Sequence, residues 1–450
     1  MSDHRYSRHD APTGRYVAPS ADNPLTATLT IPGSKSLTNR ELVLASIADG
    51  PGRLVAPLHS DDSRRMVEAL QALGTGIAEV EGEGEFGPDL VVTPAPFRAG
   101  VTVDCGQAGT VMRFVAPLAG LAEGDVMLTA HESALHRPMG AMIHALRDLG
   151  VDVDDEGSWS LPFTIRGHGR IRGGRVEIDA SESSQFVSGL LLAAPRFDVG
   201  LHLVHTGDRL PSMPHIDMTV EALHRRGIRV ERPATGEWLV EAGAPRAKEL
   251  PIEPDLSNAA PFLAAALVTG GEITVHGWPP HSTQPGGLLP ELLTLLGAHT
   301  SRQAGALTVR GGGRIRGGSL DLSAAGELAP TFVGLAAFAD EPTTIHGIGH
   351  IRGHETDRIA ALIANLRALG GEIEELPDGV RITPTALHGG DWASFHDHRM
   401  ATTGALIGLA VEGVVIDDIG TTAKTLPEFA RLWEQMLAAD EPVPVGGASA

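Results

Sequence analysis

The chain has 450 residues, of which 42% are hydrophobic, and its formal net charge at pH 7 is −21. This length is too great for one ordinary hydrophobic core and suits two domains of about 200 residues each. The negative charge repels nucleic acid and anionic membranes, and no segment reaches the roughly 18 consecutive apolar residues that a membrane-spanning helix needs. We therefore expect a soluble protein that binds neither nucleic acid nor a membrane.

The N-terminal residues lack the apolar core of a secretory signal, because Met1–Tyr16 is rich in His, Arg, Asp and Ser. We expect residues 1–19 to form a disordered tail and residues 441–450, rich in Pro, Gly and Ala, to form another. The single cysteine, Cys105, excludes an internal disulfide and a multi-thiolate zinc site, and we expect it to be a small buried hydrophobic residue. A monomer in the reducing cytoplasm fits this composition.

A helix-like segment that ends in glycine, followed by a strand-like segment, recurs along the chain. The glycines are Gly74, Gly150, Gly227, Gly297 and Gly370, which are 76, 77, 70 and 73 residues apart. Glycine here is typical of a helix C-terminus, where φ is positive. A period of about 75 residues predicts an α/β fold of six βαβαββ-type units, three in each of two similar domains. The run GRIRGG, at residues 169–174 and 313–318, indicates that the halves are homologous.

The sixth unit lacks a strand, because its last helix-like segment, residues 426–437, is followed only by the tail. We expect the alternating segment Leu25–Ile31 to supply that strand. Residues 20–32 would then belong to the C-terminal domain. The boundaries that follow are 33–252 for the N-terminal domain and 253–440 for the C-terminal domain, with chain crossings near Pro32–Gly33 and Pro251–Asp255.

Polar residues precede several apolar, helix-like runs, as an N-cap does. These residues are Ser36, Thr110, Ser183, Ser184 and Ser257. Helix N-termini that converge on one cleft bind anions through their free N–H groups, without a metal.

Lysine is rare in this chain: of 35 basic residues, only Lys35, Lys248 and Lys424 are lysines. A lysine kept where arginine is the usual choice indicates a site that needs a compact ammonium. Lys248 lies in a loop-like stretch and needs no such explanation.

The segment Pro32–Arg40, PGSKSLTNR, places Lys35 at a helix start and Arg40 one turn after Ser36, on the same face. These residues could hold an anion. A P-loop would need glycine where Ser34 stands, so ATP binding is not indicated.

This segment resembles the PGSKS-x-x-x-R signature of the EPSP synthase family, and further motifs follow in the order found in that family. They are Ala108–Arg113, Arg137–Pro138, Ser183–Gln185, Glu355–Arg358, Asp397–Met400 and Thr422–Thr425. The resemblance covers roughly residues 24–433. It implies the inside-out α/β barrel of the enolpyruvyltransferases, and transfer of the enolpyruvyl group of phosphoenolpyruvate to the 5-hydroxyl of shikimate 3-phosphate, with no cofactor.

The resemblance also implies two substrate sites. For shikimate 3-phosphate the residues are Lys35, Ser36, Arg40, Ser183, Ser184, Gln185, Ser212, Glu327, His350 and His354. For phosphoenolpyruvate they are Lys35, Gly109, Arg137, Gln185, Arg358, Arg399 and Lys424. Several cations suit a small molecule that carries both a carboxylate and a phosphate.

Four residues are implied as catalytic. Glu355 would exchange a proton with the methylene carbon, Glu327 would accept the hydroxyl proton, and Lys35 would lie near the reacting oxygens. A protonated His398 would hydrogen-bond the departing phosphate. His396 and His398 could form a metal pair, but no third ligand at a suitable spacing accompanies them, so we expect no metal.

Five polar residues depart from the pattern common in the family. They are Gln107 for Asn, His215 for Tyr, Glu327 for Asp, His350 for Asn and His354 for Lys. A histidine at position 354 can lose its charge, and Glu355 with a bound phosphate would raise its pKa toward neutrality.

Two other functions fit parts of the sequence. A UDP-N-acetylglucosamine enolpyruvyltransferase typically has a cysteine shortly before the Arg-Pro pair, whereas Ala130–His136 has none. A non-catalytic anion-binding protein on a related repeat fold, or one that processes RNA ends, would have little use for Glu355 and Lys424 beside paired arginines.

Overall fold

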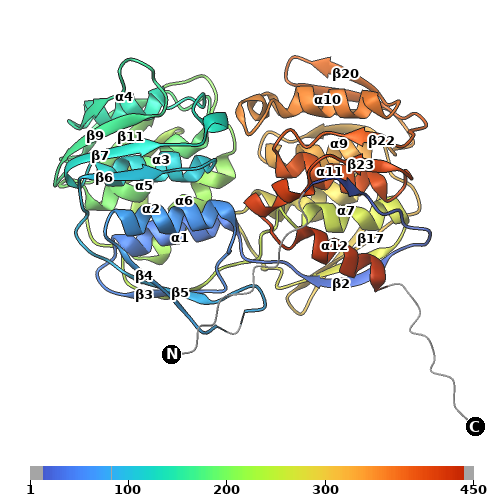
Figure 1. Ribbon diagram of the computed structural model, residues 1–450, viewed down its shortest axis with the longest axis horizontal. Helices are drawn as coiled ribbons and strands as arrows, with labels where there is room; N and C mark the ends of the chain where they lie inside the picture. The colour runs from blue at the N-terminus through green and yellow to red at the C-terminus, as the bar shows by residue number, and fades with distance from the viewer. Residues whose placement is uncertain (1–13, 83, 440–450) are drawn as a thin grey trace, which may run out of the picture.

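The structure is a computed structural model that describes residues 14–82 and 84–439. These residues form two lobes that lie side by side (Figure 1). The core of the first lobe consists of buried residues between Leu37 and Ile252, and that of the second comes from residues 18–31 and 256–436. We propose that the lobes are two domains, with boundaries at residues 32/33 and 252/253.

The first lobe contains three four-stranded sheets, in the orders β14–β3–β5–β4, β6–β7–β9–β8 and β10–β11–β13–β12. Their strands are β3 (Gly52–Val55), β4 (Gly76–Val80), β5 (Asp89–Thr93), β6 (Val101–Asp104), β7 (Glu123–Thr129), β8 (Asp152–Asp154), β9 (Phe163–His168), β10 (Gly174–Ile178), β11 (Leu201–His205), β12 (Val230–Glu231), β13 (Glu237–Val240) and β14 (Glu249–Pro251). Its α-helices are α1 (Lys35–Ser46), α2 (Asp61–Ala72), α3 (Gly109–Ala119), α4 (Gly140–Asp148), α5 (Ser184–Ala193) and α6 (Met213–Arg225).

The second lobe contains the sheets β16–β17–β15–β2, β18–β19–β21–β20 and β1–β23–β22. Their strands are β1 (Tyr16–Val17), β2 (Thr26–Thr30), β15 (Glu272–His276), β16 (His299–Gln303), β17 (Ala306–Arg310), β18 (Gly318–Asp321), β19 (Thr343–His346), β20 (Glu372–Leu376), β21 (Gly379–Thr383), β22 (Gly390–Trp392) and β23 (Val414–Ile416). Its α-helices are α7 (Ala260–Thr269), α8 (Leu289–Leu295), α9 (Ala329–Ala336), α10 (Arg358–Ala368), α11 (His398–Gly408) and α12 (Phe429–Ala438).

The repeat expected from the glycine spacing is confirmed. In the sheet β6–β7–β9–β8, for example, β6 and β7 are parallel, whereas β9 is antiparallel to both β7 and β8. All five helix-ending glycines have positive φ, at Gly74 (+104°), Gly150 (+84°), Gly227 (+79°), Gly297 (+99°) and Gly370 (+85°). The chain is therefore an α/β protein built from one repeated unit.

The strand Leu25–Ile31 does join the second lobe, but its expected place in the sixth unit is wrong. β2 pairs in parallel with β15, in the fourth unit, where Ala27 and Leu29 enter the core. The sixth unit is completed by β1, which is antiparallel to β23. A strand of two residues is too short to show an alternating pattern in the sequence. The longer segment Leu25–Ile31 was therefore expected to supply the missing strand of the sixth unit.

The expected N-terminal tail was also too long. Residues 14–19 are ordered against the second lobe, where Ala18 is buried and its N–H donates to Val414 O at 2.9 Å. Residues 1–13, the rest of the expected N-terminal tail, and residues 441–450, the expected C-terminal tail, lie outside the described residues.

The two chain crossings run next to each other. Gly33 and Pro254 form an antiparallel bridge, in which Ser34 N donates to Glu253 O at 2.7 Å and Asp255 N donates to Pro32 O at 2.8 Å. Glycine is required at position 33, because a Cβ there would lie 2.5 Å from Ala56 O. The crossings thus tie the lobes together directly before α1 begins.

A buried ion pair fixes the two helices of the first lobe that carry Lys35 and His215. Glu41 of α1 accepts from Arg226 Nε at 2.7 Å, just after the end of α6. Both side chains are fully buried, with 1% and 0% exposed. Removing one partner of such a deeply buried ion pair is costly, because the remaining charge is then neither paired nor solvated.

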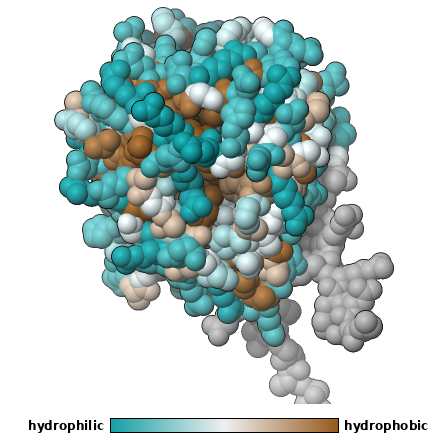
Figure 2. Space-filling view, turned by 90° about the vertical axis from the view of Figure 1, so that its left-hand side faces the viewer, coloured by the Kyte–Doolittle hydropathy of each residue, from teal (hydrophilic) through white to brown (hydrophobic). Residues whose placement is uncertain are grey.

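No helix of the described residues is long and apolar enough to cross a membrane. Figure 2 shows the end of the molecule formed by the first lobe, where hydrophilic side chains predominate and apolar ones form smaller patches between them.

We predict that Glu41→Ala lowers the free energy of unfolding by about 3–5 kcal/mol, because Arg226 is left as an uncompensated buried charge. The matched control is Glu68→Ala, which removes a carboxylate on the surface of α2 that pairs with Arg65 at 3.1 Å and should cost less than about 1 kcal/mol. Urea unfolding followed by circular dichroism measures both. Equal costs for the two variants would show that the buried pair does not hold these helices.

Candidate active site

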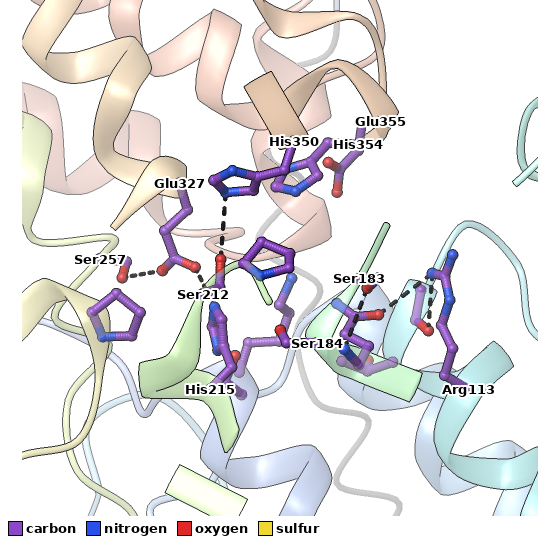
Figure 3. A pocket seen from close by; sticks show the side chains of 18 of the residues that line it. Arg113, Ser183, Ser184, Ser212, His215, Ser257, Glu327, His350, His354 and Glu355 are labelled. Carbon is purple, nitrogen blue, oxygen red and sulfur yellow. Dashed lines mark hydrogen bonds and ion pairs between the residues drawn. The ribbon is translucent and has the colours of Figure 1, made fainter. Parts of the chain in front are cut away.

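A cavity of about 370 Å³ lies between the two lobes and is lined by both. All the residues that the sequence predicts for the site line it, with the exception of Lys424. Lys424 is nonetheless adjacent, since its Nζ lies 2.6 Å from Glu355 Oε1. Figure 3 shows the groups that face each other across this space, with Glu327, His350 and Glu355 on one side and His215, Ser183 and Arg113 on the other.

Several helices begin at the cavity. α1, α3, α5 and α6 bring their first turns from the first lobe, and α10 and α11 from the second. The cap of α1 is Ser34 instead of Ser36, and α3 begins at Gly109 without a side-chain cap. Ser183 caps α5 as expected, by accepting from Gln185 N. These helix starts supply the free N–H groups that an anion site requires.

Ser257 does not cap a helix, contrary to the sequence pattern. α7 begins at Ala260, and the Ser257 hydroxyl donates instead to Glu327 Oε1. Its carbonyl accepts from Arg399 NH1 at 2.7 Å. Ser257 therefore joins two of the predicted site residues, a role that only the folded chain shows.

Glu355 lies between two cations and is largely buried, with 13% of its side chain exposed. Its Oε1 contacts Lys424, and its Oε2 accepts from Arg358 NH2 at 2.9 Å. Asp397 holds Arg358 from behind, with its Oδ2 2.7 Å from Arg358 Nε. Burial would raise the pKa of Glu355, but Lys424 and Arg358 hold it well below its usual range. Glu355 is thus ionised in the ligand-free protein.

Lys35 lies at the start of α1 beside two carboxylates and is partly buried, with 20% of its side chain exposed. Its Nζ lies 3.2 Å from Asp62 Oδ2, and its backbone N–H donates to Asp255 Oδ2 at 3.1 Å. Burial alone would lower the pKa of Lys35, but Asp62, Glu355 and Asp255 raise it. Lys35 is therefore a cation, and its paired carboxylates were not singled out from the sequence.

Arg113 is a further cation of the site to which the sequence analysis gave no role, although it ends the motif Ala108–Arg113. Its guanidinium lies over the ring of Phe186, 5.4 Å from the centroid, and NH1 lies 3.4 Å from Gln185 Oε1. Arg137 donates from NH1 to Gln107 O at 2.9 Å. Within the described chain, the buried Nε atoms of Arg113 and Arg137 have no hydrogen-bond partner. Each of these two arginines therefore has one unused hydrogen-bond donor.

Two contacts cross from lobe to lobe at the other end of the cavity. His215 Nε2 lies 2.7 Å from Glu327 Oε2, and Ser212 Oγ lies 3.4 Å from His350 Nε2 (Figure 3). Burial would raise the pKa of Glu327, but His215 and Arg399 lower it far more. Burial, with Arg209 as the next cause, lowers the pKa of His350 to about 4. Glu327 is accordingly ionised and His350 neutral.

The positive charges on His354 and His398 were expected beside a phosphate, and the protein's own groups do not favour them. Burial, followed by Arg358, lowers the pKa of His354 well below its usual value, and Arg358 NH1 donates to His354 Nδ1 at 3.0 Å. Burial, followed by Arg399, does the same for His398. The sequence shows the neighbouring Glu355 but not the guanidinium groups that fold against these rings.

Metal ligands do not gather at the site. In the parts of the chain that the structure describes, no group of three or more His, Cys, Asp or Glu side chains could hold a metal ion. Cys105 is buried, and burial raises the pKa of its thiol to about 12, so it is a neutral core residue.

The fold is that of the enolpyruvyltransferases. The structure of EPSP synthase from Acinetobacter baumannii superimposes with a TM-score of 0.77, over 94% of this chain and 98% of that one, at 23% identity. The enolpyruvyl transferase NikO from Streptomyces tendae superimposes with a TM-score of 0.74, over 94% and 98%, at 18% identity. At such identities these likenesses show the fold alone.

Sequence comparison gives the family. The family model EPSP synthase (3-phosphoshikimate 1-carboxyvinyltransferase) matches residues 19–433. A 3-phosphoshikimate 1-carboxyvinyltransferase from Kocuria rhizophila is 50% identical over 423 residues, which are 93% of this chain and 95% of the relative. The chain belongs to the EPSP synthase family, and of the two enolpyruvyltransferase families weighed from the sequence, this is the one that the comparisons support.

We predict that His354 and His398 remain neutral at pH 6, where a free imidazole with a pKa of ~6.5 is mostly protonated. The pKa values of both histidines are lowered well below the usual value, and a histidine is neutral at any pH above its pKa. Nitrogen-15 chemical shifts of labelled histidines report the charge, and His354→Gln and His398→Gln assign the signals. An imidazolium shift for either residue at pH 6, measured without substrates, would contradict this reading of the site.

Proposed function

We propose that the cleft between the lobes is the active site in which this transferase moves the enolpyruvyl group of phosphoenolpyruvate to the 5-hydroxyl of shikimate 3-phosphate. The products are 5-enolpyruvylshikimate 3-phosphate and phosphate, in the shikimate pathway to aromatic amino acids. Family membership supports the reaction. The observation that best supports the site is Glu355, a largely buried carboxylate between Lys424 and Arg358 on the same side of the cavity as Glu327.

Phosphoenolpyruvate would bind at the cationic end. Lys424, Arg358 and Arg399 approach from the second lobe, while Lys35, Arg137 and Gln185 approach from the first, beside Gly109. The space beside Gly109 is narrow, because a Cβ there would lie 2.7 Å from Arg113 NH1. The forked guanidinium groups match a carboxylate and a phosphate, and the start of α3 adds backbone N–H groups.

Shikimate 3-phosphate would bind nearer the starts of α5 and α6. Its phosphate would accept from hydroxyls and helix N–H groups at Ser183, Ser184 and Ser212. The other polar residues that line this part of the cavity are Ser36, Gln185, His350 and His354. Arg40 has a different part, since its guanidinium donates to Thr219 Oγ1, Ser36 O and His215 O. Arg40 thus fixes the backbone at Ser36 and His215, next to the residues that would bind the substrate.

The chemistry requires three proton movements. The 5-hydroxyl loses its proton to Glu327 as its oxygen bonds to C2 of phosphoenolpyruvate, and Glu355 gives a proton to the methylene carbon. Glu355 then takes a proton back from the new methyl group as the C–O bond to phosphate breaks. Lys35 stabilises negative charge on the reacting oxygens, and His398 donates a hydrogen bond to the departing phosphate as a neutral ring.

Glu355 must change its protonation state before the first of these steps. In the ligand-free protein its two cations keep it ionised, and an ionised carboxylate cannot give a proton to carbon. An anionic substrate between Lys424 and Arg358 competes with Glu355 for both cations, which raises the pKa of the carboxyl toward the value a general acid needs. Substrate binding thus prepares the acid.

We further propose that the protein acts as a cytoplasmic monomer on these two small molecules, without a cofactor or a nucleic-acid partner. Both lobes of one chain contribute to the cavity, so a second copy is not required for a complete site.

Mixing the purified protein with both substrates tests the function. Phosphate should be released only when phosphoenolpyruvate and shikimate 3-phosphate are both present, and a chelator should not stop it. Phosphate release that needs only one substrate, or that EDTA abolishes and a divalent ion restores, would contradict the proposal.

Lysine variants refine the same assay. Lys35→Arg and Lys424→Arg should each lower turnover at least about 100-fold, because a larger planar cation displaces the reacting groups. The matched control is Lys248→Arg, at an exposed position near β14, which should be nearly silent. Equal tolerance at all three positions would show that Lys35 and Lys424 are not needed as compact ammonium groups.

A further inference from the structure

The carboxylate of Glu327 is held by one residue from each lobe. Glu327 lies in the short 3₁₀-helix Gly326–Leu328 of the second lobe, where Ser257 donates to its Oε1. His215 of the first lobe donates from Nε2 to its Oε2 at 2.7 Å. The two side chains are 17% and 20% exposed, so the contact is largely screened from solvent. Both oxygens are therefore oriented only while the two lobes are together (Figure 3).

The backbone of His215 is fixed firmly in the first lobe. It lies in the first turn of α6, after Ser212 in the left-handed region with φ of +54°. Its carbonyl accepts from Arg40 NH2 at 2.9 Å and from Thr219 Oγ1 at 3.0 Å. Arg40 belongs to α1, the helix that begins with Lys35. A displacement of the first lobe therefore moves the His215 ring together with Lys35.

We propose that His215 is a positioning residue for Glu327: its Nε2–H hydrogen bond orients the carboxylate for the hydroxyl of shikimate 3-phosphate and assembles the base only when the lobes are closed. This inference rests on the proposed function, in which Glu327 accepts that proton. The O–H bond of the substrate breaks as its oxygen bonds to carbon, and the proton passes to Glu327. His215 keeps its own proton throughout and continues to donate to the resulting carboxylic acid.

The charges around Glu327 allow this role to be measured. Burial raises its pKa, and His215 is the first of the groups that lower it. The other charged or titratable groups that act on Glu327 are Arg399, Arg358, Arg40, Asp255 and His354. Burial disfavours the charged form of Glu327, and His215 counteracts that effect. Without His215 the pKa of Glu327 therefore rises, and the base becomes protonated at a higher pH.

The test compares His215→Phe, which keeps a ring but removes the donor, with His215→Gln, which retains an N–H donor. We expect His215→Phe to lower kcat about 10- to 100-fold with little change in KM for phosphoenolpyruvate. The acid limb of its kcat profile should move to higher pH. His215→Gln should recover much of kcat and return the limb toward the wild-type position.

The matched control is His202→Phe. His202 of β11 lies 3.1 Å from Glu237, so it also forms a histidine–glutamate pair, but outside the cavity. This variant should keep the wild-type kcat and pH profile. Calorimetric titration with shikimate 3-phosphate shows whether each variant is folded and binds.

An unchanged acid limb in His215→Phe, or a loss confined to KM for shikimate 3-phosphate, would overturn the inference while leaving the proposed function intact. A His215→Gln variant as impaired as His215→Phe, although it binds shikimate 3-phosphate normally, would also overturn it. Absence of phosphate release by the wild-type protein would overturn the proposed function itself, and the inference with it.

Discussion

The ion pairs of Glu355 govern the behaviour of the whole site. A carboxylate buried with Lys424 and Arg358, and an arginine buried in turn with Asp397, form a chain of charges that is balanced without any ligand. Charges at this depth are stable only when paired, so each member fixes the position of the next. In the proposed reaction, an anionic substrate would disturb that balance and so link binding to the protonation of Glu355.

The fold gives this arrangement its geometry. Six copies of one unit place several helix starts at a common cleft, and the paired crossings at Gly33 and Pro254 hold Lys35 beside Asp255. The Glu41–Arg226 pair holds α1 and α6 together at a distance from the cleft. Residues far apart in the sequence, such as His215 and Glu327, meet as a result. The repeat therefore provides the helix N-termini, and the meeting of the two lobes provides the contact between His215 and Glu327.

Much of the fold could be predicted from the sequence, because its signals are local. The glycines that end helices and the alternating strands report backbone conformation directly, and the motifs around Lys35 and Glu355–Arg358 identify the family. The placement of β2 could not be predicted, since an alternating segment shows that a strand exists but not which sheet it joins. β1 was missed because two residues have no period.

The sequence predicted which residues lie at the cavity, but not the protonation states of its histidines. Every residue expected there lies at the cavity or, for Lys424, next to it. The neutral states of His354 and His398 depend on burial and on Arg358 and Arg399, which only the fold brings against them. Ser257 and Arg113 acquire their contacts in the same way. Residue types thus indicated the reaction, whereas the protonation states needed the three-dimensional neighbours.

The central claim, that Glu355 carries protons to and from the methylene carbon once substrates displace its cations, is tested most directly by turnover in heavy water. The wild-type protein should place deuterium in the methylene group of the product, because Glu355 exchanges with solvent between transfers. Glu355→Gln should release no product and place no deuterium in phosphoenolpyruvate. Deuterium incorporation by Glu355→Gln at a rate near that of the wild type would contradict the account.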